Sequence, residues 1–314
     1  MRVPIWTVVL PITAIGVGGA LEFAFAGSIS AFYSILLLPL LLSSVFAAVH
    51  HAEVISAKLG EPAGPIVLAL AVTAIEVALI ASILLGAEDS ESAVARDTVF
   101  ATIMIVLNGI VGLCLLIGGL RFRRQVFRGQ SAISALGVLG TLAILALVLP
   151  NYTTSKSGPV YAPVQLVFVA AVSLALYGVF LYIQTVSHRE DFVDQADLPL
   201  AGSEPPRGTF IAAIPLLILS LVGVVLIAEL LAVPVEHAID SAGLPAALVG
   251  VAIASIVLLP EAVTAVKAAG ANRLQTSINL ALGSALASIS LTIPAVAAIS
   301  LAMDSTLILG LTAE

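Results

Sequence analysis

The chain has 314 residues, of which 60% are hydrophobic and only 10% are charged, and its formal net charge is −7. A water-soluble domain of this length needs far more polar surface, so the composition excludes that class. The acidic balance also excludes a basic nucleic-acid-binding surface, and the single cysteine, Cys114, excludes an intramolecular disulfide. The apolar runs are longer than the roughly ten-residue strands of a membrane barrel. We therefore predict an all-α polytopic membrane protein.

At about 20 residues per crossing, the apolar runs predict nine transmembrane helices. The first run lacks a convincing cleavage site and is followed by many others, so we interpret it as a membrane helix rather than a signal peptide. The predicted spans cover residues 5–26, 29–52, 64–86, 98–120, 131–149, 161–186, 210–232, 246–267 and 276–302.

Positive charges are distributed unequally between the predicted loops. If the amino terminus is cytoplasmic, only Arg96 and Lys156 of the 12 Lys and Arg residues fall on the far side. Cytoplasmic loops of membrane proteins are enriched in these residues. The asymmetry therefore predicts a multi-pass protein of the inner (cytoplasmic) membrane of a prokaryote, with its amino terminus in the cytoplasm.

The third predicted span carries a glutamate near its middle, in the sequence Val72-Thr73-Ala74-Ile75-Glu76. A carboxylate at membrane depth is expensive and is usually kept for an ion or proton pathway. Thr73, and Asn108 in the next span, add oxygen atoms to this part of the chain. Interhelical hydrogen bonding is the alternative role for each of these two residues.

A proline-containing stretch with five carboxylates, residues 187–209, separates the two halves of the chain. We interpret it as a solvated cytoplasmic linker. The alternative is a cation-sensing segment, because clustered carboxylates attract Ca²⁺, although the spacing is not that of an EF-hand. The predicted organisation is a first transmembrane helix at 1–28, a first inverted-repeat half at 29–186, the acidic linker at 187–209, and a second half at 210–314 that we expect to be incomplete.

A second deep glutamate, Glu261, follows Pro260 in the eighth predicted span. His51-Ala52-Glu53 and Glu236-His237-Ala238 each precede a deep glutamate by 25 positions, and each is followed by a short Gly/Pro break. From the distribution of Lys and Arg between the loops, the helix that carries Glu76 and the helix that carries Glu261 are predicted to cross the membrane in opposite directions. The two halves are therefore predicted to be inverted repeats. Candidate access-path residues are His51, Glu53, Glu236 and His237, with simple solvation at the membrane interface as the alternative.

The inverted repeat predicts that Glu76 and Glu261 approach each other near mid-membrane, around a pseudo-two-fold axis. Together they would offer two negative charges to a divalent cation such as Ca²⁺, which prefers six to eight oxygen ligands. When the cation leaves, mutual repulsion and lost solvation favour protonation, so protons replace the metal. Supporting oxygens are predicted to come from Thr73, Asn108 and Ser284, and Asn279 and Ser288 are further candidates for the access path.

Two stretches carry a family resemblance. Leu259-Pro260-Glu261 through Asn272–Ser288 resembles the second α-repeat of bacterial ChaA-type calcium/proton antiporters, in the cation/calcium exchanger superfamily, and Ala71–Glu76 resembles the matching part of the first repeat. The resemblance implies the sodium/calcium-exchanger fold, with eleven helices where this chain has about nine. It also implies Ca²⁺/H⁺ exchange in which Glu76 and Glu261 bind the cation, and it matches Asn108 and Ser284 to polar positions of the family.

The leading hypothesis is a secondary active antiporter that exchanges Ca²⁺ for H⁺. The wider family often has Gly-Asn where this chain has Val72-Thr73 and Val257-Leu258, so exchange of Na⁺ or K⁺ for H⁺ stays an alternative. A cation channel or sensor is a third hypothesis. An enzyme is not expected, since no nucleophile–base or metal-ligand spacing occurs. No cofactor is expected, and the predicted partners are inorganic cations, protons and the lipid bilayer.

Overall fold

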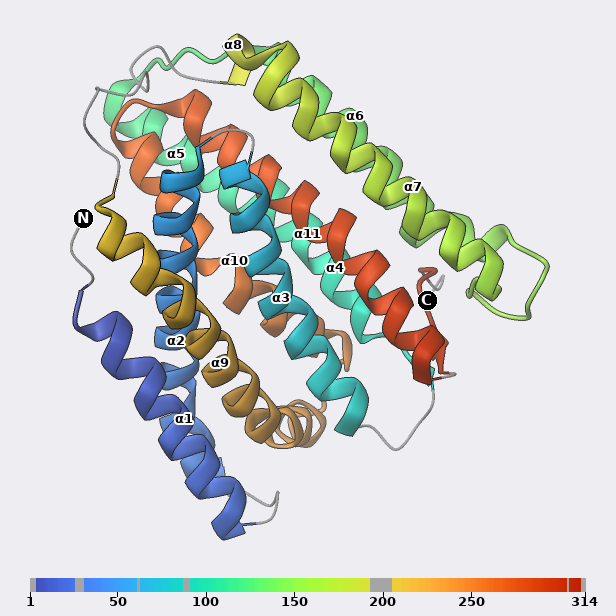
Figure 1. The fold of residues 1–314 in the computed structure, drawn as a ribbon. Helices are drawn as coiled ribbons and strands as arrows, with labels where there is room; N and C mark the ends of the chain where they lie inside the picture. Colours follow the sequence, from blue (N-terminus) through green and yellow to red (C-terminus); the bar gives the residue numbers. More distant parts are fainter. Residues whose placement is uncertain are drawn as a thin grey trace. The chain divides into compact units, whose positions relative to one another are not determined.

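The computed structural model describes residues 4–25, 31–60, 63–86, 91–192, 205–303 and 305–311. The described chain is almost entirely helical (Figure 1). Its α-helices are α1 (Trp6–Phe25), α2 (Ala31–Leu59), α3 (Ala63–Gly86), α4 (Val94–Met104), α5 (Val111–Phe122), α6 (Gly129–Ala143), α7 (Pro163–Tyr182), α8 (Arg189–Phe192), α9 (Arg207–Ser241), α10 (Ala247–Gly270) and α11 (Leu274–Met303). π-Helical turns η1 (Ile105–Ile110), η2 (Ile144–Val148) and η4 (Ile183–Ser187), a 3₁₀ turn η3 (Leu149–Tyr152), and strands β1 (Glu91–Ser92) and β2 (Thr306–Leu307) complete the described elements.

The prediction of an α-helical membrane protein is confirmed. Seven helices in the described part of the chain are long and apolar enough to cross a membrane. In α1 and α3, at the predicted spans 5–26 and 64–86, the apolar stretches Trp6–Leu21 and Ile66–Ala81 are shorter. The count of nine spans therefore stays a prediction.

The chain divides into two compact units. The first consists of Met1–Glu88 and Ser203–Val257, and the second of Asp89–Gly202 and Leu258–Glu314. The division is one of packing, whereas the predicted halves 29–186 and 210–314 are a division of sequence symmetry, which stays a prediction.

In the first unit, α2 packs against α1, α3 and α9, and α1 also packs against α9 (Figure 1). The contact of α1 with α9 is close because both helices place a glycine there. A Cβ added to Gly18 would lie 3.3 Å from the Cβ of Leu226, and one added to Gly223 would lie 3.3 Å from the Cβ of Ala14. Small residues of this kind let the backbones of membrane helices approach.

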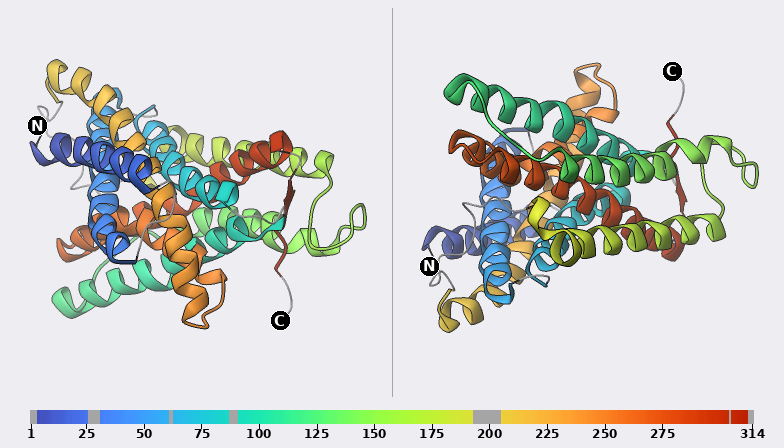
Figure 2. Two further views of the ribbon diagram at one scale, coloured as in Figure 1. Left: turned by 90° about the horizontal axis from the view of Figure 1, so that it is seen from below. Right: turned by 90° about the horizontal axis from the view of Figure 1, so that it is seen from above.

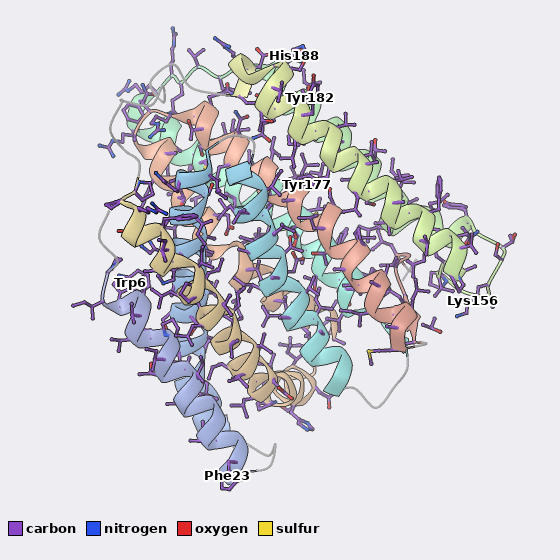
Figure 3. The ribbon with its side chains drawn as sticks, in the orientation of Figure 1. Trp6, Phe23, Lys156, Tyr177, Tyr182 and His188 are labelled. Atoms are coloured by element: carbon purple, nitrogen blue, oxygen red, sulfur yellow. The ribbon has the colours of Figure 1, made fainter. Side chains whose placement is uncertain are left out.

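The first helix carries an aromatic residue near each end. Trp6 begins α1 and Phe23 lies close to its other end, and both are exposed (Figure 3). Trp and Tyr side chains are enriched at the two membrane–water interfaces. The exposed Trp6 is therefore compatible with the predicted span 5–26, which stays a prediction.

In the second unit, α11 packs against α4, α5, α6 and α7, and lies alongside α6 and α7 in Figures 1 and 2. Most residues of α11 are buried, which is unusual for an apolar membrane helix that could face lipid on one side. The helix is 30 residues long and therefore spans about 45 Å at 1.5 Å per residue. It is the central element of this unit.

Two long helices end in left-handed residues that satisfy their last carbonyl groups. Gly243 (φ 66°) ends α9, where Leu244 N–H donates to Ile239 O over 3.0 Å. Asn272 (φ 63°) ends α10, where Arg273 N–H donates to Ala268 O over 3.0 Å. These are Schellman caps, which favour Gly and Asn because other side chains clash in this conformation.

The segment after α11 is tied to loops of the second unit. β2 pairs in parallel with β1, and Leu311 N–H donates to Leu147 O over 2.9 Å. The hydroxyl of Tyr161 donates to Leu145 O over 2.5 Å. Leu145 and Leu147 lie in the π-helical turn η2, whose wider ladder leaves backbone carbonyls for such donors. Burial raises the pKa of Tyr161 to about 12, so its hydroxyl stays a donor at physiological pH.

Candidate functional site

Glu76 lies inside the first unit, on α3, and is only 1% exposed. Its helix neighbours Val72, Ile75 and Leu79 are buried as well. Thr73 lies one helical turn earlier, on the same side of α3, and is 5% exposed. Its hydroxyl oxygen has no hydrogen-bond partner among the residues that the structure describes. A buried hydroxyl oxygen one turn from a carboxyl group is suited to bind a cation.

A contact between α2 and α3 indicates which residues of the two helices lie at about the same height along the helix axes. A Cβ added to Gly64 would lie 2.5 Å from the backbone oxygen of Ser56. The two helices follow each other through a short connection and run antiparallel, so equal steps away from this contact reach about the same level. Glu76 is then roughly level with Ser44, which is fully buried and donates to Leu40 O over 2.9 Å. Sequence reasoning missed Ser44, although the antiparallel count identifies it.

Glu261 belongs to the second unit and is 7% exposed, on α10. Helix α10 continues through Pro260, which has no N–H to donate, so one carbonyl a turn earlier loses its usual helical partner. The hydroxyl of Thr264 donates to Pro260 O over 2.9 Å. That threonine is therefore engaged within its own helix, unlike Thr73.

The serine candidates lie on α11. Ser284 is half-buried and Ser288 is buried, and their spacing of four residues places them on one side of the helix. Two further hydroxyl groups, those of Ser290 and Thr292, are fully buried and lack a hydrogen-bond partner in the part of the chain that the structure describes. Sequence reasoning did not single these out, because nothing in their spacing separates them from packing residues.

Asn108 lies in the π-helical turn η1 and is exposed. Its side-chain amide donates to Met104 O over 3.2 Å, one turn earlier. π-Helical turns occur often at functional positions, so the location is compatible with the predicted cation-binding role, which stays a prediction.

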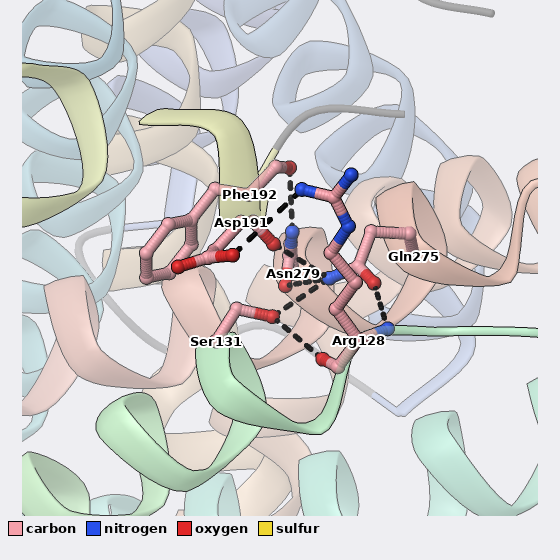
Figure 4. Close-up of polar contacts among 6 residues, drawn as sticks. All are labelled: Arg128, Ser131, Asp191, Phe192, Gln275 and Asn279. Carbon is pink, nitrogen blue, oxygen red and sulfur yellow. Dashed lines mark hydrogen bonds and ion pairs between the residues drawn. The ribbon is translucent and has the colours of Figure 1, made fainter. Parts of the chain in front are cut away.

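Asn279 takes part in a polar network at the start of α11 (Figure 4). Its amide donates to Phe192 O over 2.6 Å, and Gln275 Nε2 lies 3.2 Å from its oxygen. The buried Gln275 also accepts from the backbone N–H of Arg128 over 2.5 Å, and its Nε2 lies 2.7 Å from Ser131 Oγ. The network fastens α8, where the acidic linker begins, to α6 and α11. Linker residues 193–204 lie outside the described residues.

The remaining access-path candidates belong to the first unit. His51 is fully buried on α2, and Glu53, two residues later, is exposed. His237 is exposed near the end of α9, and the side chain of Glu236 lies outside what the structure describes. Among the described side chains of these four residues, only that of His51 is buried.

The structure therefore joins Thr73 to Glu76 in one unit, and groups Ser284 with Ser288 in the other. The two carboxylates belong to different units, each described by itself, and their meeting stays a prediction. No group of three or more His, Cys, Asp or Glu side chains suited to a metal ion occurs within the described ranges. Hydroxyl and backbone oxygens also serve as ligands of Ca²⁺.

Known proteins resemble most of this chain. The family described as sodium/calcium exchanger protein matches residues 29–186 and 212–312. The putative ionic transporter y4hA of Sinorhizobium fredii is 50% identical over 312 residues, covering 99% of this chain and 85% of that protein. The sodium-potassium/proton antiporter ChaA of Escherichia coli is 38% identical over 265 residues, covering 83% of this chain and 71% of ChaA. A Ca²⁺/H⁺ antiporter of Aphanothece halophytica is 28% identical over 209 residues, covering 62% of this chain and 56% of that protein.

Among solved structures, native YfkE has a similar fold. The TM-score is 0.72 with 18% sequence identity, and the match covers 98% of this chain and 86% of YfkE. At this identity the likeness concerns the fold alone. It confirms the sodium/calcium-exchanger-like fold predicted from the resemblance of residues 259–288.

Proposed function

This chain belongs to the sodium/calcium exchanger family, and we propose that it is a secondary active antiporter that exchanges Ca²⁺ for H⁺. It is a multi-pass membrane protein, and the similar proteins y4hA and ChaA are bacterial. We place it in the inner membrane, with its amino terminus in the cytoplasm, on the strength of the charge asymmetry between its loops.

One observation carries the proposal: a buried glutamate and a buried, unpaired hydroxyl lie one turn apart on an apolar membrane helix. Glu76 is 1% exposed, and the Thr73 hydroxyl has no hydrogen-bond partner in the described chain. A membrane helix keeps such groups at depth only at a cost, which a transport role explains. Packing alone would be served as well by aliphatic side chains of similar size.

In the proposed cycle, Glu76 and Glu261 bind the cation or protons alternately. A carboxylate that holds a divalent cation must be deprotonated, so binding the metal releases protons and protonation releases the metal. Ca²⁺ is a hard cation that takes oxygen ligands in flexible geometry. Thr73, Asn108 and Ser284 would supply additional oxygens, and backbone carbonyls near Pro260 would add to them. His51, Glu53, Glu236, His237, Asn279 and Ser288 are proposed to line the approaches.

Exchange of Na⁺ or K⁺ for H⁺ is the second candidate. The name of the E. coli relative, sodium-potassium/proton antiporter, favours it. Glu76 and Glu261 could exchange a monovalent cation for H⁺ as well, since Na⁺ and K⁺ also compete with protons for carboxylate oxygens. The two candidates differ in the charge moved per proton, and hence in the cation that dissipates a pH gradient.

The test is exchange in everted vesicles that contain the full chain. A pH gradient, acid inside, is imposed and reported by a quenched dye, and Ca²⁺, Na⁺ and K⁺ are added in turn. Dequenching with Ca²⁺ alone supports the leading proposal, and dequenching with Na⁺ or K⁺ alone replaces it by the second. A cation current that does not dissipate the pH gradient would mean a channel and would overturn both.

Two substitutions, Glu76→Gln and Glu261→Gln, test the proposed role of the two glutamates in exchange. The amide keeps the size of the side chain but cannot release a proton or carry a charge. We expect each variant to accumulate in the membrane and to lose exchange. Full Ca²⁺/H⁺ exchange by either variant would remove that glutamate from the mechanism.

A further inference from the structure

Helix α2 carries two consecutive histidines inside the candidate span Leu37–Leu59. His51 is fully buried and His50 is half-buried. Their ring centres lie 5.6 Å apart in an edge-on arrangement, and the ring of Trp6 on α1 lies 6.2 Å from that of His50. Ionisable side chains within membrane spans are rare and mark functional positions by default.

The contacts of His51 determine which ring nitrogen carries its hydrogen. Nε2 lies 3.1 Å from the backbone oxygen of Thr7. A carbonyl oxygen only accepts hydrogen bonds, so Nε2 is the protonated nitrogen of the neutral ring, and Nδ1 holds the free electron pair. Nδ1 is buried and has no hydrogen-bond partner among the described residues. Buried acceptors are normally paired, so this one calls for a proton or a water molecule.

Along the helix axis, His51 lies between the Lys58 end of α2 and the height of Glu76. Counting from the contact of Ser56 with Gly64, His51 is roughly level with Ala69 on α3. Glu76 is then about seven residues, or about 10 Å, farther along. Lys58, on the other side of His51, lies near the end of α2.

Titratable or charged residues occur on α2 and on two of the helices packed against it. In the neighbouring α1, no charged side chain is described within residues 6–25. Near Val54 and Ile55, α9 contributes the apolar residues Phe210, Ala213 and Leu217. The titratable or charged residues on α2 itself, on α3 and on α9 are His50, Glu53, Lys58, Glu76, Arg207, Glu229, Glu236, His237 and Asp240.

We propose that His51 is a proton-accepting residue on the access path to Glu76. Its Nδ1 binds one proton from a hydronium ion, which becomes water. The ring becomes a cation with two N–H donors, and the Thr7 carbonyl keeps its bond to Nε2. Release of the same proton restores the neutral ring, and no other bond changes. The role in exchange rests on the proposed antiport function, whereas the protonation itself does not.

The first test is a titration of the full-length protein in detergent. Imidazole-¹⁵N-labelled protein is followed by NMR, and each histidine is assigned by the loss of its signal in a single His→Gln variant. We expect Nδ1 of His51 to gain a proton as pH falls through about 8 to 5, the range in which histidines titrate. A ring that stays neutral over this range would overturn the proposal, whether or not the vesicles exchange cations.

The second test is exchange by His51→Gln. The glutamine amide can still donate to the Thr7 carbonyl but cannot titrate. We expect exchange to slow by about tenfold or more and to lose part of its dependence on pH. The matched control is His188→Gln, because His188 is exposed at the end of α7 and η4 (Figure 3), and it should behave as wild type.

These outcomes distinguish a failure of the His51 proposal from a failure of the proposed antiport function. An unchanged rate and pH profile in folded His51→Gln would overturn the access-path role. Absence of exchange in the wild type, with normal titration of His51, would instead count against the proposed antiport function. Should the variant not fold, the titration of the wild-type ring still decides whether His51 accepts a proton.

Discussion

Thr73→Val separates a cation ligand from a structural hydroxyl, because the two roles predict opposite changes in stability. Thr73 is 5% exposed, and its hydroxyl has no partner in the part of the protein that the structure describes. Valine keeps the branched shape and nearly the same volume. The substitution therefore removes one oxygen atom and its burial cost, with little change in packing.

The magnitudes follow from the burial of that oxygen. A buried polar group without a partner costs about 1–3 kcal/mol, so we expect the free energy of unfolding of the cation-free protein to rise by about 1 kcal/mol. Loss of one ligand oxygen should weaken cation affinity, and a tenfold weakening corresponds to about 1.4 kcal/mol. The variant should accordingly be more stable without the cation and gain less stability when the cation is added.

The assay combines thermal unfolding in detergent with calorimetric titration of the transported cation. The control is Thr98→Val, because Thr98 is also fully buried but its hydroxyl donates to Val94 O over 2.7 Å. That variant loses a formed bond, so its stability should fall by about 0.5–1.5 kcal/mol while affinity stays unchanged. Equal destabilisation by both substitutions, with unchanged affinity in Thr73→Val, would refute the reasoning.

Three further predictions concern other parts of the molecule. Apparent Ca²⁺ affinity, measured by calorimetry, should weaken as pH falls from about 8 to 6, because protons compete for the same carboxylates; an affinity independent of pH would indicate a separate proton path. Gly18→Leu should destabilise the protein by about 1–3 kcal/mol through overpacking against α9, whereas Gly16→Leu, where an added Cβ meets nothing within 4 Å, should not; equal unfolding temperatures would contradict this. Burial raises the pKa of Tyr161 to about 12, so its contribution to stability is complete below about pH 10 and is lost as pH rises through 12; Tyr161→Phe should unfold at a lower temperature at neutral pH and lose less stability on alkaline titration.

The sequence was sufficient for the fold class, whereas the count of nine spans stays a prediction. Apolar runs of about 20 residues must form helices in a bilayer, because no water is present to satisfy the backbone. The Gly/Pro break that contains Gly243, a residue free to adopt positive φ, marked the end of α9. Glu76 and Glu261 are both buried, whereas their depth in the membrane, which follows from counting residues along each span, stays a prediction.

Partners of side chains could not be predicted in this way, because they depend on which helices pack together. Asn279 appeared in the sequence as one polar residue on an apolar helix, and only the packing of α8 on α11 assigned its amide to Phe192. Thr73 and Thr264 occupy similar places near the two glutamates in the sequence, yet the hydroxyl of one is unpaired in the described chain while the other donates to Pro260. Likewise, the crossing of α1 over α2 gave His51 the Thr7 carbonyl and thereby fixed its tautomer. Hydrogen bonds form over about 3 Å between segments distant in sequence, so tertiary structure alone decided these contacts.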